Sequence, residues 1–136
     1  MDADTARTRF AAERVARLAT VGEDGAPHVV PVVFAVTGNR VVTAVDHKPK
    51  TTKHLRRLRN IETNPQVSLL ADHYDDDWAR LWWTRADGHA RILQTGPDRE
   101  TALDALAAKY PQYRDHRPTG PAIVVHVTRW TGWSAT

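Results

Sequence analysis

The chain has 136 residues, of which 26% are charged and 41% hydrophobic, and it carries a formal net charge of +3. This length and composition predict a single globular domain spanning residues 1–136. Cysteine is absent, which excludes disulfides, thiol nucleophiles and thiolate metal sites. The N-terminus lacks the apolar segment of a secretory signal, and no run approaches the roughly 20 apolar residues of a membrane helix. We therefore expect a cytoplasmic protein without a membrane segment.

The first half of the chain predicts one helix and three strands. The helix is expected over residues 5–16 with Thr5 as its cap. The strands are expected over residues 18–21, 28–36 and 40–46, with turns at residues 22–27 and 37–40. The second strand is apolar almost throughout, so we expect it to be buried on both faces. Pro31 has no amide hydrogen and should lie at an edge or a bulge.

The second half predicts two helices among further strands. A helix is expected to begin after Thr51 or Thr52 and to end before Pro65. The next strands are expected over residues 66–74, 78–85 and 89–93, with a hairpin turn or bulge at 86–88. A helix over 98–109, a loop over 111–121 and a strand over 122–133 complete the chain. Six or more short strands with short helices between hairpins predict a mainly β, α+β fold, built as a small antiparallel barrel.

Positive charge is concentrated in residues 47–59, which contain six Lys or Arg and two His within thirteen positions. On a helical wheel, Leu55 and Leu58 share a face that should pack on the barrel, with Lys53, Arg57 and Asn60 on the opposite side. Two like charges four residues apart destabilise a helix by about 0.2–0.5 kcal/mol, and a bound anion would reverse that effect.

The start of this helix adds a second feature that suits an anion. Lys50, Thr51 and Thr52 lie where free amides and the helix dipole favour negative charge. Three interpretations are open: a solvated charged face, a nucleic-acid contact, or a pocket for a phosphorylated small molecule. No aromatic residue interrupts the basic run, which disfavours a nucleic-acid partner.

Other candidate residues carry less chemical information. Of the five Trp residues, Trp78 and Trp130 are the two that we place near a planar ring. The acidic residues at 72–77 fit no EF-hand or zinc spacing, so no metal site is predicted. No nucleophile elbow or catalytic triad is present, and no catalytic residue is assigned.

Four segments together resemble a known family. They are RLATVGEDGAPHVVPVVFAV (17–36), KPKTTKHLRRLRNIETNPQVSLL (48–70), DHYDDDWARLWWTRADGHARI (72–92) and RWTGW (129–133). They are similar to the split-barrel, flavin-binding superfamily of pyridoxamine 5′-phosphate oxidase, and more narrowly to its actinobacterial branch of coenzyme F420-dependent enzymes. The resemblance implies a split β-barrel and a homodimer with the cofactor in a groove at the interface.

The resemblance also implies positions for the cofactor. Arg57 and Asn60 match the basic pattern that holds the phosphate, and the ring is expected near His28, Pro31 and Val32. Lys50, Thr51 and Lys53 join the set from the charge argument above. The substrate-binding Arg and His signature of the FMN-using oxidases is not evident near the C-terminus.

The expected activity is hydride transfer between F420 and an unidentified small organic substrate. Because F420 and FMN are both ring–ribityl–phosphate molecules, FMN is the alternative cofactor. An FMN-dependent oxidase or reductase, a non-catalytic F420-binding protein and a nucleic-acid-binding module are the alternative functions.

Overall fold

The computed structural model describes residues 1–45 and 55–136. In chain order, its elements are α1 (Ala3–Ala12), β1 (Ala16–Val21), β2 (Pro27–Val32), β3 (Ala35–Thr37), β4 (Arg40–Ala44), α2 (Arg56–Thr63), β5 (Gln66–His73), η1 (Trp78–Arg80), β6 (Trp82–Leu93), α3 (Pro97–Lys109), α4 (Pro111–Asp115) and β7 (Ala122–Ser134). The predicted α+β class with a mainly antiparallel sheet is confirmed.

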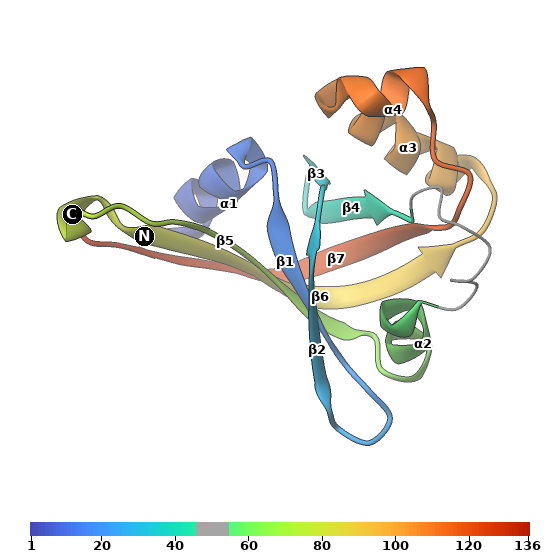
Figure 1. Ribbon diagram of the computed structural model, residues 1–136, viewed down its shortest axis with the longest axis horizontal. Helices are drawn as coiled ribbons and strands as arrows, with labels where there is room; N and C mark the ends of the chain where they lie inside the picture. Colours follow the sequence, from blue (N-terminus) through green and yellow to red (C-terminus); the bar gives the residue numbers. More distant parts are fainter. Residues whose placement is uncertain (46–54) are drawn as a thin grey trace.

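The strands form one seven-stranded sheet in the order β2-β1-β5-β6-β7-β4-β3, and every neighbouring pair is antiparallel. The long strands β5, β6 and β7 extend side by side toward the end of the molecule that carries both termini (Figure 1). The helices α3 and α4 lie near β4 at the other end, and α2 lies near the far end of β6.

The sheet curls around a single inner core. Strands from opposite ends of the sheet order contribute to the same cluster, which includes Leu18 of β1, Val41 of β4 and Ile123 of β7. Phe10 of α1 and Phe34 close this cluster, with ring centroids 4.7 Å apart. Because both halves of the sheet contribute side chains to the same core, the fold is the split barrel that the family resemblance implies.

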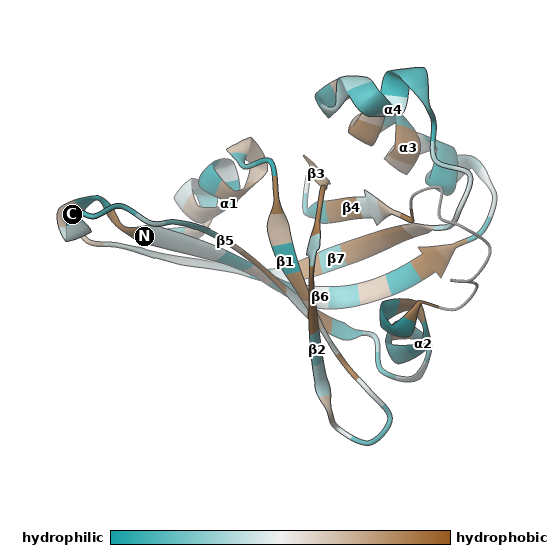
Figure 2. Ribbon diagram, viewed as in Figure 1, coloured by the Kyte–Doolittle hydropathy of each residue, from teal (hydrophilic) through white to brown (hydrophobic). Residues whose placement is uncertain are grey.

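A second cluster lies between α3 and the other face of β4 and β7. Leu103, Leu106 and Tyr110 pack there against Val42 and Val124. Figure 2 shows hydrophobic colour on these strands and on part of α3, whereas α4 is mainly hydrophilic. The sheet therefore separates two cores, one inside the barrel and one under α3.

Two predictions about the first half of the chain are wrong. The first helix is capped by Asp2, whose carboxylate accepts a hydrogen bond from the Thr5 amide at 2.8 Å, and it ends at Ala12. The predicted strand over residues 28–36 is two strands, and β2 is an edge strand rather than one buried on both faces. Val29, on its outer face, is 59% exposed. The edge position of Pro31 is confirmed.

The basic helix starts later than predicted. Its N-cap is Leu55, which has extended backbone and no capping side chain, so neither Thr51 nor Thr52 is the cap. Trp78 lies in the short helix η1 rather than in a strand, because the Asp77 carboxylate caps that turn by accepting from the Ala79 amide at 3.1 Å.

Two further features lie after residue 85. Residues 86–88 continue strand β6 and form no hairpin turn. The register shift between Asp87 and Gly88 is a bulge in the neighbouring strand β7, where Thr128 is the extra residue. The expected loop over 111–121 begins with α4. Within the described residues, no helix is long and apolar enough to cross a membrane.

Candidate cofactor site

A buried polar contact joins α2 to β1. The Asn60 amide donates to the Thr20 hydroxyl at 3.0 Å, and the two residues are 5% and 1% exposed. The prediction that Asn60 faces away from the barrel is therefore wrong. The side chain tolerates burial because it finds a partner on the inner face of β1. Leu58 packs against the core as predicted, together with the buried Ile61.

Arg57 lies one turn before Asn60 and is partly buried, whereas Arg56 and Arg59 are exposed. The Nε atom of Arg57 is buried and has no hydrogen-bond partner. Burial lowers the pKa of Arg57, and the Tyr113 phenol acts in the opposite direction. A partly desolvated guanidinium with an unsatisfied donor favours an anion that neutralises and hydrogen-bonds it.

His28 lies across from Thr20 in the β1–β2 ladder, so Asn60 and His28 flank the same hydroxyl-bearing residue. The Nδ1 atom of His28 is buried without a partner. Val32 shares this inner face and is buried, whereas Pro31 lies on the outer face and is exposed. The structure thus places His28 and Asn60 on either side of Thr20, with Arg57 one turn earlier on α2. It turns Pro31 to the other side of β2.

The two predicted tryptophans lie in different surroundings. Trp130 packs edge-on against Phe10 with 5.4 Å between ring centroids, and its indole N–H is buried without a partner. Trp78 is 70% exposed in η1, beyond the end of the β5–β6 ladder opposite to α2. A single chain therefore does not bring Trp78 to Arg57. The predicted residues Lys50, Thr51 and Lys53 lie outside the described residues.

A hollow of about 410 Å³ opens on the outer face of the sheet. Its lining includes Ala19, Pro27, Ser68, Asp87 and His89. The Ser68 hydroxyl donates to the Asp87 carboxylate, which also pairs with Arg85 at 3.0 Å. Sequence reasoning missed Ser68 and Asp87. The available signal was the alternation along β5 and β6, which sends these polar residues to the face opposite the core.

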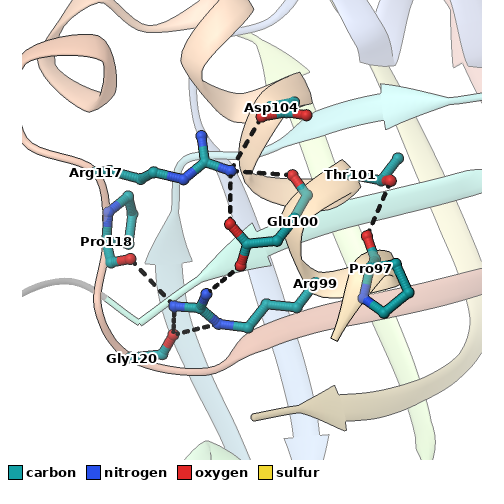
Figure 3. Close-up of polar contacts among 8 residues, drawn as sticks. All are labelled: Pro97, Arg99, Glu100, Thr101, Asp104, Arg117, Pro118 and Gly120. Atoms are coloured by element: carbon teal, nitrogen blue, oxygen red, sulfur yellow. Dashed lines mark hydrogen bonds and ion pairs between the residues drawn. The ribbon is translucent and has the colours of Figure 1, made fainter. Parts of the chain in front are cut away.

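The loop before β7 is anchored by a residue that the sequence did not single out. The Arg99 side chain, 12% exposed, donates to the carbonyls of Gly120 at 2.9 Å and Pro118 at 3.2 Å and pairs with Glu100 (Figure 3). The Val45 amide donates to the carbonyl of Pro121 at 3.0 Å. Arg99 thus fixes this loop beside the end of β4.

The described part of the chain contains no group of three His, Asp or Glu side chains arranged to hold a metal ion.

Solved structures share this fold over nearly the whole chain. A conserved hypothetical protein from Mycobacterium tuberculosis is 19% identical with a TM-score of 0.79, covering 99% of this chain and 86% of its own. An FAD-binding protein from Mesorhizobium loti is 20% identical with a TM-score of 0.74, covering 97% and 92%. A heme storage protein from Vibrio cholerae is 18% identical with a TM-score of 0.71, covering 98% and 95%. A search of curated proteins finds no match.

The sequence itself matches a family model. The model describes pyridoxamine 5′-phosphate oxidase and matches residues 3–134, which is almost the entire length. The chain therefore belongs to the pyridoxamine 5′-phosphate oxidase family.

Proposed function

We propose that the protein is a cytoplasmic, homodimeric oxidoreductase that binds coenzyme F420 and transfers a hydride between it and a small organic substrate. FMN is the alternative cofactor. The observation that carries the proposal is the partly buried Arg57, whose Nε lacks a partner beside the buried contact between Asn60 and Thr20. A phosphate group would satisfy both the charge and the free donor.

The residues present fit such a cofactor. Among the described residues, four buried side-chain nitrogen or oxygen atoms lack a hydrogen-bond partner, and three of them belong to His28, Arg57 and Trp130. All three residues were selected from the sequence as cofactor contacts. Arginine and indole nitrogens donate, and a neutral imidazole nitrogen either donates or accepts. Buried polar atoms are normally paired, so their coincidence with the predicted set supports a ligand.

Each residue has a distinct role in this proposal. Arg57 holds the phosphate, with Lys50, Thr51 and Lys53 as additional contacts, and Asn60 fixes α2 against β1. His28 and Val32 border the ring on the inner side of β2. When bound, the cofactor supplies the carbon that carries the hydride. The protein residues bind and orient it, and no described side chain is assigned to proton transfer.

The homodimer is supported by the outer face of the sheet. Val29 of β2 and Leu70 of β5 are large exposed hydrophobic residues. Pro31 is exposed on the same face of β2 as Val29, and Arg17 of β1 lies between Pro31 and Leu70. An exposed apolar group of this kind is typical of an interface. Because Trp78 lies far from α2 in one chain, its predicted contact with a cofactor requires the second protomer.

The decisive experiment is a fluorescence titration of the purified protein with F420 and with FMN. Arg57→Ala should weaken binding of the preferred cofactor roughly ten- to hundredfold, as expected for loss of a charge-assisted hydrogen bond. Arg56→Ala is the matched control, because it removes the same charge from an exposed position on the same helix. Equal affinities of the two variants would remove Arg57 from the site.

The same titration separates the alternatives. Preference for FMN would retain the fold and change the chemistry to that of a flavin enzyme. Binding of F420 without reduction of any tested acceptor would indicate a carrier. A titration with heme covers the binding activity named for the Vibrio cholerae relative.

A further inference from the structure

Three basic side chains form a line across the outer face of the sheet. His89 of β6 pairs with His126 of β7, and His126 pairs with Arg40 of β4. Figure 1 shows these three strands side by side. Residues directly opposite one another in antiparallel strands project from the same face, and all three residues are exposed. We call His89, His126 and Arg40 the basic row.

A further arginine, Arg91, lies close enough to the basic row to affect His126. Arg91, two positions after His89 on β6, pairs with Asp98 of α3 at 3.4 Å. Within the described ranges, no ion pair joins a member of the basic row to a carboxylate. When the histidines are protonated, the row carries like charges on neighbouring strands, which destabilise a sheet and favour a counter-ion.

The pKa of His126, the middle residue of the row, responds to the neighbouring positive charges. The pKa of His126 is lowered, first by partial desolvation and then by the positive charges of Arg40 and Arg91. An anion bound at the row would oppose the second of these effects.

The basic row begins at the rim of a hollow. His89 lines the hollow of about 410 Å³, together with the apolar residues Ala19, Val21 and Pro27. An organic ligand that seats its apolar part in this hollow could reach the row with an acidic end.

We propose that His89, His126 and Arg40 form an anion-binding site for a carboxylate or phosphate group. The site shares no residue with the cofactor site proposed around Arg57, so either can fail without the other. Its ligand is a free inorganic anion or the acidic end of an organic molecule seated in the hollow.

The test is an NMR titration of the histidine imidazoles in sodium sulfate and in sodium chloride of equal ionic strength. Sulfate serves as the probe because its charge is constant between pH 6 and 8. It should raise the pKa of His126 by about half a unit or more relative to chloride. His116, at the end of α4, lies outside the basic row and should not respond differently to the two salts.

Two variants sharpen the result. Arg40→Gln should weaken sulfate binding about fivefold or more. Arg129→Gln removes the same charge from an exposed position on β7 outside the row and should leave the affinity unchanged. Thermal melts establish that both variants are folded. Equal effects of sulfate and chloride, equal responses of His116 and His126, or equal losses in the two variants would overturn the proposal.

A final comparison distinguishes the two sources of the anion. If the ligand is organic and uses the hollow, phenyl phosphate should bind tighter than inorganic phosphate at pH 7.5, and the difference should disappear when a bulky side chain fills the hollow in Ala19→Trp. Equal affinities, both dependent on Arg40, would assign the row to a free anion.

Discussion

Asn60 and Thr20 form a buried side-chain hydrogen bond of 3.0 Å that joins α2 to the inner face of β1. This contact holds the helix that carries Arg57 against the strand that faces His28. Asn60, which the resemblance predicts as a cofactor contact, therefore has a structural partner.

Asn60→Ala should lower the free energy of unfolding by about 1–3 kcal/mol, because it leaves the Thr20 hydroxyl buried without its donor. Urea denaturation measures this loss. Thr63→Ala, on the exposed side of the same helix, is the control and should cost less than about 0.5 kcal/mol. In a double-mutant cycle with Thr20→Val, the two losses should not be additive. Additive losses would show that the hydrogen bond does not couple α2 to β1.

Arg57→Met should separate stability from binding. The guanidinium is partly buried with an unpaired Nε, so an apolar side chain of similar length should maintain or raise the melting temperature of the ligand-free protein. The same substitution should weaken cofactor binding. A clear fall in melting temperature without ligand would mean that Arg57 is a structural residue.

The strand pattern could be predicted from the sequence because turns and alternation are local signals. The edge position of Pro31 followed from its missing amide hydrogen, and the antiparallel pairing of successive strands followed from the turns between them. The exposure of β2 could not be predicted in this way. An apolar sequence such as residues 28–36 predicts a strand that is covered on both faces. It does not indicate whether the covering surface belongs to the same chain or to a second one.

The candidate site was predictable in part. Arg57 and His28 were identified by charge and by resemblance, and both carry buried, unpartnered nitrogens. The orientation of Asn60 was missed because the apolar face was placed from Leu55, which is the N-cap rather than a helical residue, whereas the neighbouring Ile61 is buried together with Asn60. The role of Arg99 in holding the loop before β7 was missed because its acceptors are backbone carbonyls, which every residue type provides.

Arg99→Ala should destabilise the protein by about 2–4 kcal/mol, since it removes charge-assisted bonds to the carbonyls of Pro118 and Gly120. Proteolysis within residues 116–121 should become faster than in the parent protein. Arg117→Ala removes a more exposed arginine that bonds Glu100 and Asp104, and it should cost about 1 kcal/mol or less. Equal losses in the two variants would contradict the anchoring role of Arg99.

Gly88→Ala tests the close approach of β6 and β7 at the bulge. A Cβ atom at this position would lie 2.1 Å from the carbonyl oxygen of His126, so the strands must separate to accept it. The expected loss in free energy of unfolding is about 1–3 kcal/mol or more. Gly25→Ala is the comparison, because that site is open but has φ +83°, and it should cost about 1 kcal/mol. A smaller loss for Gly88→Ala than for Gly25→Ala would show that the bulge adapts.

We expect the free energy of unfolding to rise at alkaline pH because of Lys109. Its ammonium donates to the carbonyls of Ala11 and Glu13 at 3.1 and 2.6 Å and lies 3.9 Å from the centre of the Phe34 ring. Desolvation, followed by the nearby charge of Arg14, lowers the pKa of Lys109 from 10.5 to about 8. Below pH 8 both folded and unfolded chains are protonated, and the folded protein bears the full cost of the desolvated charge.

Between pH 8 and about 10 the folded chain releases this proton first, so unfolding takes up a proton and stability increases with pH. Burial raises the pKa of Tyr110, which opposes the gain only above pH 10. Lys109→Met should lack the rise, and Lys109→Arg should also lack it because guanidinium stays charged. Urea denaturation at intervals from pH 7 to 10 measures the difference. Parallel curves for the parent protein and Lys109→Met would show that Lys109 titrates alike in the folded and unfolded chains.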